Sequence, residues 1–325
     1  MLHLLTVLAL AVPAATRVAD TVPSQPVTLK TATGDLHGTE VLPSGAGRPA
    51  VVLIVPGSGP TDRDGNSPVP VAPGKTLHTD TYRLLAASLA ANGIASVRYD
   101  KRGVAASAAA MAGKTESDLT FENGIDDAVA WVNMLRADSR FSKVIVVGHS
   151  EGSLIGMVAA ARAKADGFVS LEGAGRPAAV VLHEQMASRG VPSEMYAATL
   201  DSLQAGKTVA NPAPALAALF RPSVQPYLIS WFRYDPAAEL RKLPFATLVI
   251  QGSNDIQTST ADAQALASAP SAKLVMIDGM THVLKDGPAD PQSQLAGVYT
   301  EPALPLDTTA VNAIVAYVKA AQLRK

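Results

Sequence analysis

Residues 144–164 join an aliphatic strand, a turn between two glycines and an Ala-rich helix, and no other segment constrains the fold as strongly. The strand leads into Gly148-His149-Ser150-Glu151-Gly152, which fits the pattern Gly-x-Ser-x-Gly. A strand-to-helix turn this sharp strains the backbone of the central serine and brings neighbouring chain too close for side chains at the two glycines. The pattern therefore predicts a serine hydroxyl exposed at a helix N-terminus, where the helix dipole favours developing negative charge.

Short aliphatic runs alternate with amphipathic segments along most of the chain. Buried strands are predicted at 51–55, 94–99, 143–147, 168–171, 247–251 and 274–277, and helices at 82–92, 121–136, 151–164 and 308–323. Continuous aliphatic runs are typical of strands covered on both faces. The alternation predicts an α/β fold with a mostly parallel, doubly wound sheet. Residues 27–31 and 36–42 surround a Gly-Asp turn and predict an N-terminal antiparallel hairpin.

One segment interrupts this alternation. Residues 173–243 show no strand pattern but contain helical stretches broken by prolines. Long insertions of this kind in compact domains are usually functional, so we predict a helical lid at about 176–243 within one domain, 21–325. Three aromatic residues in it, Trp231, Phe232 and Tyr234, either wall an acyl pocket or form a small lid core.

The composition excludes several classes of protein. The chain has 325 residues and a formal net charge of −1, so no long-range field favours nucleic acid or a membrane surface. It has no cysteine, which excludes disulfides, thiolate metal sites and a cysteine nucleophile. The apolar run at 4–12 is too short to span a bilayer, and no other run is long enough. Small residues follow it, so we predict a signal peptide at 1–20 and export to the periplasm or medium. Without a signal function there, the protein would be cytoplasmic.

A serine nucleophile needs a base, and the base needs an orienting carboxylate. His282 follows the last predicted strand, and the only other histidine after Ser150 is His183, inside the predicted lid. His282 is therefore the predicted base, whereas His149 points into the turn and is predicted to be structural. Asp255 follows the strand 247–251 and is the predicted carboxylate, with Glu172 as the reserve candidate.

Acyl transfer also needs N–H donors for the oxyanion of the tetrahedral intermediate. One donor is predicted to be the backbone N–H of Glu151, directly after the nucleophile. The other is expected in the loop Pro56-Gly57-Ser58-Gly59-Pro60, where we favour Ser58, with Gly57 or Gly59 as alternatives. The polar segment 61–66 either cradles a substrate or ties loops together by ion pairs, and we favour the second. Segment 98–103 is predicted to hold loops together rather than to take part in catalysis.

These motifs together resemble those of the α/β-hydrolase superfamily, and in particular its bacterial esterases and acyl hydrolases. The resemblance runs from about residue 27 to the end. It is carried by segments 56–66, 99–103, 148–152, 234–236, 251–255 and 282–285. It implies a triad of Ser150, Asp255 and His282, no metal or organic cofactor, and hydrolysis of small carboxylic esters through an acyl-enzyme. A peptidase, an acyltransferase or a non-catalytic binding protein of the same fold are the alternatives. The sequence fixes neither the natural ester nor the oligomeric state.

Overall fold

The computed structural model describes residues 23–45 and 47–323. The predicted signal peptide lies outside these residues, so export stays a prediction. None of the helices in the described ranges is both long enough and apolar enough to cross a membrane.

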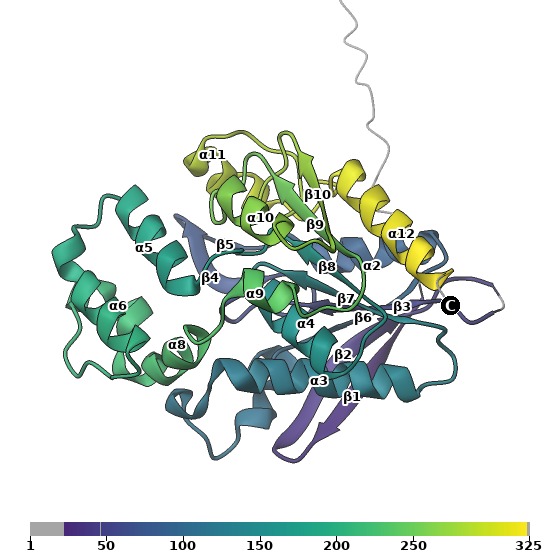
Figure 1. Ribbon diagram of the computed structural model, residues 1–325, viewed down its shortest axis with the longest axis horizontal. Coiled ribbons are helices and arrows are strands. Elements are labelled where there is room, and N and C mark those ends of the chain that lie inside the picture. Colours follow the sequence, from purple (N-terminus) through teal and green to yellow (C-terminus); the bar gives the residue numbers. More distant parts are fainter. Residues whose placement is uncertain (1–22, 46, 324–325) are drawn as a thin grey trace, which may run out of the picture.

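An eight-stranded sheet forms the centre of the molecule (Figure 1). Its order is β1-β2-β6-β3-β7-β8-β9-β10, and all neighbours from β6 to β10 are parallel. The hairpin β1–β2 and the β2–β6 pair are antiparallel. The strands are β1 (Ser24–Thr31), β2 (Gly34–Val41), β3 (Val51–Val55), β6 (Ala95–Tyr99), β7 (Val144–His149), β8 (Gly167–Leu171), β9 (Thr247–Gly252) and β10 (Ala272–Ile277). The predicted fold class, including the N-terminal antiparallel hairpin, is confirmed.

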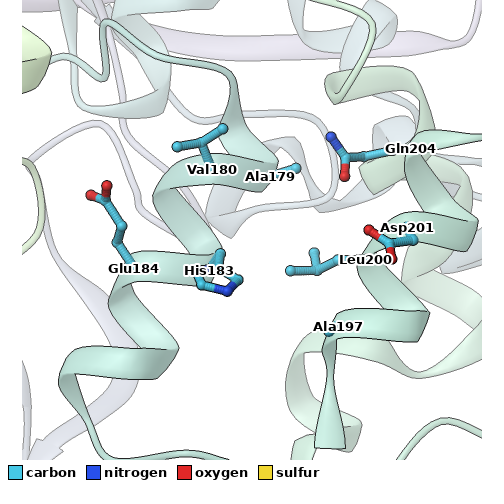
Figure 2. A pocket seen from close by; sticks show the side chains of 8 residues that line it. All are labelled: Ala179, Val180, His183, Glu184, Ala197, Leu200, Asp201 and Gln204. Atoms are coloured by element: carbon cyan, nitrogen blue, oxygen red, sulfur yellow. The ribbon is translucent and has the colours of Figure 1, made fainter. Parts of the chain in front are cut away.

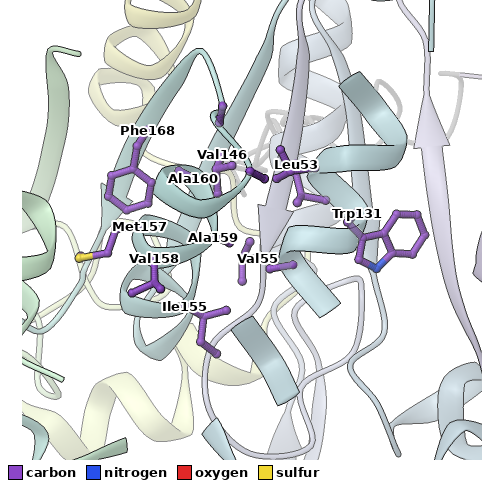
Figure 3. Close-up of a cluster of buried hydrophobic side chains, with 14 of the residues drawn as sticks. Leu53, Val55, Trp131, Val146, Ile155, Met157, Val158, Ala159, Ala160 and Phe168 are labelled. Carbon is purple, nitrogen blue, oxygen red and sulfur yellow. The ribbon is translucent and has the colours of Figure 1, made fainter. Parts of the chain in front are cut away.

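Helices cover both faces of this sheet because successive strand residues point to opposite sides. The helices are α2 (Thr81–Ala91), α3 (Phe121–Ala137), α4 (Glu151–Arg162), α5 (Ala178–Ser188), α6 (Ala197–Gln204), α7 (Ala217–Phe220), α8 (Gln225–Trp231), α9 (Pro236–Leu240), α10 (Thr260–Ala267), α11 (Pro291–Ala296) and α12 (Thr308–Gln322). In β3, Leu53 and Val55 pack with residues of α3 and α4, as Figure 3 shows. Val52 and Ile54 pack with α2 and α12 on the other face.

A second, two-stranded sheet was not predicted from the sequence. It consists of β4 (Ser67–Ala72) and β5 (Lys75–Leu77), which pair antiparallel with irregular register. Prolines at 68, 70 and 73 hid the strand pattern, and proline is tolerated here because such a hairpin has only edge strands.

The helices α5–α9 lie between β8 and β9 and within the segment 176–243. They include a small apolar cluster of their own, which comprises Met186, Tyr196, Leu200, Leu203, Phe220 and Leu228. In Figure 1, α5, α6 and α8 stand together at the left of the view, beyond the main sheet. Whether this segment acts as a lid stays a prediction.

Candidate active site

Ser150 occupies the strained turn between β7 and α4. Its φ of 56° and ψ of −126° lie in a region that L-residues rarely adopt. A Cβ atom on Gly148 would lie 2.2 Å from the carbonyl oxygen of Gly152, and one on Gly152 would lie 2.4 Å from that of Val55. Only glycine fits either position, as the sequence pattern predicts. The turn directs the Ser150 side chain into a cavity, and its hydroxyl has no hydrogen-bond partner among the described residues.

His282 and Asp255 form a buried pair. The His282 Nδ1–H donates to Asp255 Oδ2 at 2.7 Å, and the two side chains are only 4% and 1% exposed. Thr258 Oγ1 donates to the same carboxylate oxygen at 2.7 Å, and the backbone N–H groups of Gln257 and Thr258 donate to Oδ1. Burial alone would raise the pKa of Asp255, but His282, then Glu172 and the Gln257 N–H, hold it well below its usual range. The carboxylate is therefore ionised and fixes the histidine tautomer that leaves Nε2 free to accept a proton.

His282 and Ser150 line the same cavity, which has a volume of about 80 Å³. The histidine loop follows β10 and the nucleophile follows β7, and both therefore lie at the carboxyl ends of parallel strands. The structure thus brings together the three residues predicted as a triad. Their catalytic roles stay predictions.

Glu172, the reserve carboxylate, is completely buried behind this pair and is not bonded to His282. Its φ of 48° is strained, and its Oε1 accepts the Gly252 N–H at 2.8 Å. Its Oε2 has no donor in the described structure, although it lies beside the Asp255 carboxylate. Burial and the negative charge of Asp255 raise the pKa of Glu172 well above its usual range. A second negative charge beside the ionised Asp255 is disfavoured, so we expect Glu172 to keep its proton and to share it with Asp255.

The same three side chains offer ligand atoms within 4.8 Å of one another, a spacing that metal sites also show. The donor chemistry does not fit a cation, because His282 Nδ1 is used in the hydrogen bond to Asp255, and the raised pKa of Glu172 disfavours the ionised form that a cation would need.

The four predicted oxyanion residues differ in how their N–H groups are used. Ser58 and Gly57 line the cavity with Ser150. The Gly57 N–H already donates to the Tyr82 hydroxyl at 3.0 Å, so it is committed elsewhere. The N–H groups of Ser58 and Glu151 donate no hydrogen bond within the described residues, which leaves them available. Neither Gly59 nor Glu151 is among the residues that line the cavity, although Glu151 directly follows Ser150 in the chain.

The walls of the cavity come from an unexpected part of the chain. Leu77 of the β4–β5 hairpin, Gln257 and Tyr299 line it, together with several threonines that follow β3 and β5. None of the lining residues belongs to the helical insertion. Trp231 instead stacks on Phe121 of α3 at 5.7 Å between ring centroids, and the aromatics of the insertion serve packing.

A separate cavity of about 310 Å³ lies between α5 and α6 of the insertion (Figure 2). His183 of α5 faces Leu200 of α6 across it, and Glu184 and Asp201 also line it. The His183 ring also contacts the Tyr196 ring edge-on, with 5.4 Å between the ring centroids. This cavity holds none of the predicted catalytic residues.

The two polar segments lock loops beside the site. Arg63 bonds Asp100 at 2.6 Å, and Arg98 bonds Asp64 at 2.9 Å. Both pairs join the loop after β3 to the end of β6, in agreement with the structural role predicted for these segments.

Comparisons with known proteins agree with this architecture. Residues 66–205 match a family model described as serine aminopeptidase, S33. Over 259 residues the chain is 29% identical to Esterase EstD of Thermotoga maritima, a match that covers 78% of this chain and 58% of EstD. The α/β-hydrolase GrgF from Penicillium sp. sh18 superposes with a TM-score of 0.59 at 16% identity, covering 93% of this chain and 100% of that one. Est1E from Butyrivibrio proteoclasticus, solved with ferulic acid, gives 0.57 at 15% identity, covering 91% and 98%. The chain therefore has the α/β-hydrolase fold.

Proposed function

We propose that this protein is a serine carboxylesterase that hydrolyses small carboxylic esters through an acyl-enzyme on Ser150. The observation that carries this proposal is the convergence of an unpartnered serine hydroxyl and a carboxylate-held histidine on one cavity. The similarity to EstD and the motifs at 56–66 and 148–152 also favour a bacterial esterase.

The chemistry follows from the geometry. His282 Nε2 takes the hydroxyl proton as Ser150 Oγ bonds to the ester carbonyl carbon, and the carbonyl electron pair moves to its oxygen. The N–H groups of Ser58 and Glu151 stabilise that oxyanion. The intermediate collapses, and the alcohol leaves with the proton from His282. Water then attacks the acyl-enzyme by the same steps in reverse, releasing the acid and restoring Ser150. Asp255 stabilises the imidazolium in both halves.

The cavity supports a small acyl group. A volume of about 80 Å³ accommodates a few heavy atoms, far fewer than a long acyl chain. The substrate class that fits is an ester of a short acid, with the alcohol part extending outward.

Labelling with a fluorophosphonate probe tests this function directly. We expect the wild type and Ser202→Ala to be labelled and to hydrolyse p-nitrophenyl acetate, whereas Ser150→Ala does neither. Ser202 is a suitable control because it is a partly exposed serine of α6 that does not line the cavity. Equal labelling of Ser150→Ala and the wild type would remove Ser150 from the mechanism.

The family match favours a second candidate, a peptidase, since its model is described as a serine aminopeptidase. Aminoacyl p-nitroanilides separate the two candidates. Faster turnover of these amides than of p-nitrophenyl acetate would replace the esterase proposal. Transfer of the acyl group to an added alcohol would indicate an acyltransferase. If neither substrate class were turned over, the protein would be a binding protein.

A further inference from the structure

A continuous chain of hydrogen bonds joins the predicted oxyanion loop to the histidine loop behind Ser150. The Gly57 N–H lies 3.0 Å from the Tyr82 hydroxyl oxygen. That oxygen lies 2.8 Å from His149 Nδ1, and His149 Nε2 lies 2.7 Å from the carbonyl oxygen of His282. Tyr82 and His149 are both buried. The chain thus crosses from the loop after β3, through α2 and the end of β7, to the loop after β10.

The two backbone groups at the ends of this series of hydrogen bonds decide which atom donates and which accepts in each bond. A carbonyl oxygen only accepts, so His149 Nε2 must carry a hydrogen. In a neutral imidazole Nδ1 is then an acceptor, so the Tyr82 O–H donates to it, and the Tyr82 oxygen is left to accept the Gly57 N–H. Each polar atom in the chain has one partner of the right kind.

The imidazole of His149 is neutral. Burial lowers the pKa of His149 to about 3, and repulsion from the His282 ring, whose centroid is 4.8 Å away, adds to this lowering whenever His282 is protonated. The Asp255 carboxylate partly opposes this lowering. The hydrogen-bond directions therefore stay the same throughout the pH range in which an esterase works.

The carbonyl of Gly57 is held as well, on the opposite side. Lys101 Nζ donates to it at 2.5 Å. This carbonyl belongs to the same peptide unit as the Ser58 N–H, and in a planar trans peptide the two groups point in opposite directions. Anchoring the carbonyl therefore sets the direction of the predicted oxyanion donor.

We propose that Tyr82, His149 and Lys101 are positioning residues. They fix the Gly57–Ser58 peptide, which carries the predicted oxyanion N–H, and the loop that carries His282 at set positions on either side of Ser150. This inference rests on the proposed esterase function. Tyr82 and His149 line the same cavity as Ser150, but the mechanism assigns none of the three side chains a bond to a reacting atom. They act through Gly57 and the backbone of His282. The histidine of the Gly-His-Ser-Glu-Gly turn, which sequence reasoning gave only a structural role, is the link between the two loops.

Tyr82→Phe tests the proposal, with Tyr317→Phe as a matched control. The Tyr317 hydroxyl also accepts a backbone N–H, from Phe168 at 3.0 Å, and donates to a carbonyl, of Ala246 at 2.6 Å. It lies at the opposite end of the strands. Both variants lose one hydroxyl and leave one backbone N–H without its acceptor. The Tyr82 hydroxyl is buried and Tyr317 is only half-buried, so Tyr317→Phe controls for the loss of the hydroxyl and its two hydrogen bonds and should cost no more stability than Tyr82→Phe.

Only Tyr82→Phe should affect the reaction. We expect kcat for p-nitrophenyl acetate to fall on the order of 10- to 100-fold with little change in KM, because small displacements of an oxyanion donor are costly. Inhibition by a trifluoromethyl ketone, which forms an oxyanion on Ser150, should weaken by the same factor. Lys101→Met should likewise lower kcat and leave KM almost unchanged. Equal kcat values for Tyr82→Phe and Tyr317→Phe would overturn the proposal.

A double variant tests whether Tyr82 and His149 act as one chain. His149→Gln breaks the chain at the same hydrogen bond as Tyr82→Phe. The combined variant should therefore lose no more activity than the worse single variant. Losses that multiply would show that the two residues act separately.

A readout that is independent of turnover separates this inference from the proposed function. Nitrogen-15 NMR of the histidine rings, with the His149 signal assigned by its absence in His149→Gln, should show a neutral Nε2–H tautomer from pH 5 to 8. Ser150→Ala should leave that signal in place. If Ser150→Ala remained active while His149 kept this tautomer, the esterase mechanism would fail and the hydrogen-bond chain would stand. A ring protonated at Nδ1, or titrating near neutral pH, would overturn the chain itself.

Discussion

Replacing the buried Glu172 by glutamine should stabilise the protein, and increasingly so as the pH rises. The glutamine keeps both contacts of the native side chain, since its carbonyl oxygen can accept the Gly252 N–H and its amide can donate to Asp255. It removes only the ability to ionise. The native glutamic acid, completely buried and beside an ionised carboxylate, is instead forced to keep its proton in the folded state.

The size of the effect follows from proton linkage. Burial, then the charge of Asp255, raises the pKa of Glu172 well above its usual value, while the unfolded chain has a pKa of about 4.3. Between these two values the folded protein binds more protons than the unfolded chain, so its stability falls as the pH rises. The slope approaches about 1.4 kcal/mol per pH unit, and it ends once the pKa of the folded state is passed. The stability of Glu172→Gln does not fall with pH for this reason, because glutamine cannot ionise.

Urea unfolding of the wild type and Glu172→Gln at pH 4.5, 5.5 and 6.5 measures the difference. We expect the two free energies of unfolding to lie within about 1 kcal/mol at the lowest pH and to separate by about 1.4 kcal/mol for each further unit. Glu194→Gln, at an exposed position, controls for the loss of a carboxyl group and should show no such separation. A pH-independent difference for Glu172→Gln would refute the reasoning that Glu172 is neutral.

Three further outcomes are expected. Asp255→Asn should lower kcat for p-nitrophenyl acetate on the order of 10⁴-fold, because asparagine favours the wrong histidine tautomer; a loss below tenfold would contradict that role. Gly152→Ala should cost several kcal/mol in urea unfolding, since its Cβ would lie 2.4 Å from the Val55 carbonyl oxygen, against about 1–2 kcal/mol for Gly74→Ala, which has open space but a positive φ. Gln257→Ala should enlarge the cavity and raise the butyrate-to-acetate ratio of kcat/KM about tenfold; an unchanged ratio would show that this wall does not limit the acyl group.

The sequence alone predicted the nucleophile turn and the parallel sheet around it. The two glycines that flank His149-Ser150-Glu151 leave few backbone alternatives. The requirement at Gly148 is local, because its Cβ would meet Gly152, whereas Gly152 faces the end of β3. The order of strands and loops then placed Asp255 and His282 at the same sheet edge as Ser150, because parallel strands end together. No knowledge of distant contacts was needed for these predictions.

Only the tertiary structure decided which segments line the cavity and which of the polar groups around it are charged. The β4–β5 hairpin contains prolines that obscure its strand pattern, and its place beside Ser150 depends on contacts far along the chain. The neutral state of Glu172 and the bonds of Tyr82 with His149 and Gly57 likewise arise from burial and from partners far apart in sequence. Steric limits act between neighbouring residues and can be predicted from the sequence, whereas desolvation and hydrogen-bond pairing depend on what the folded chain brings together.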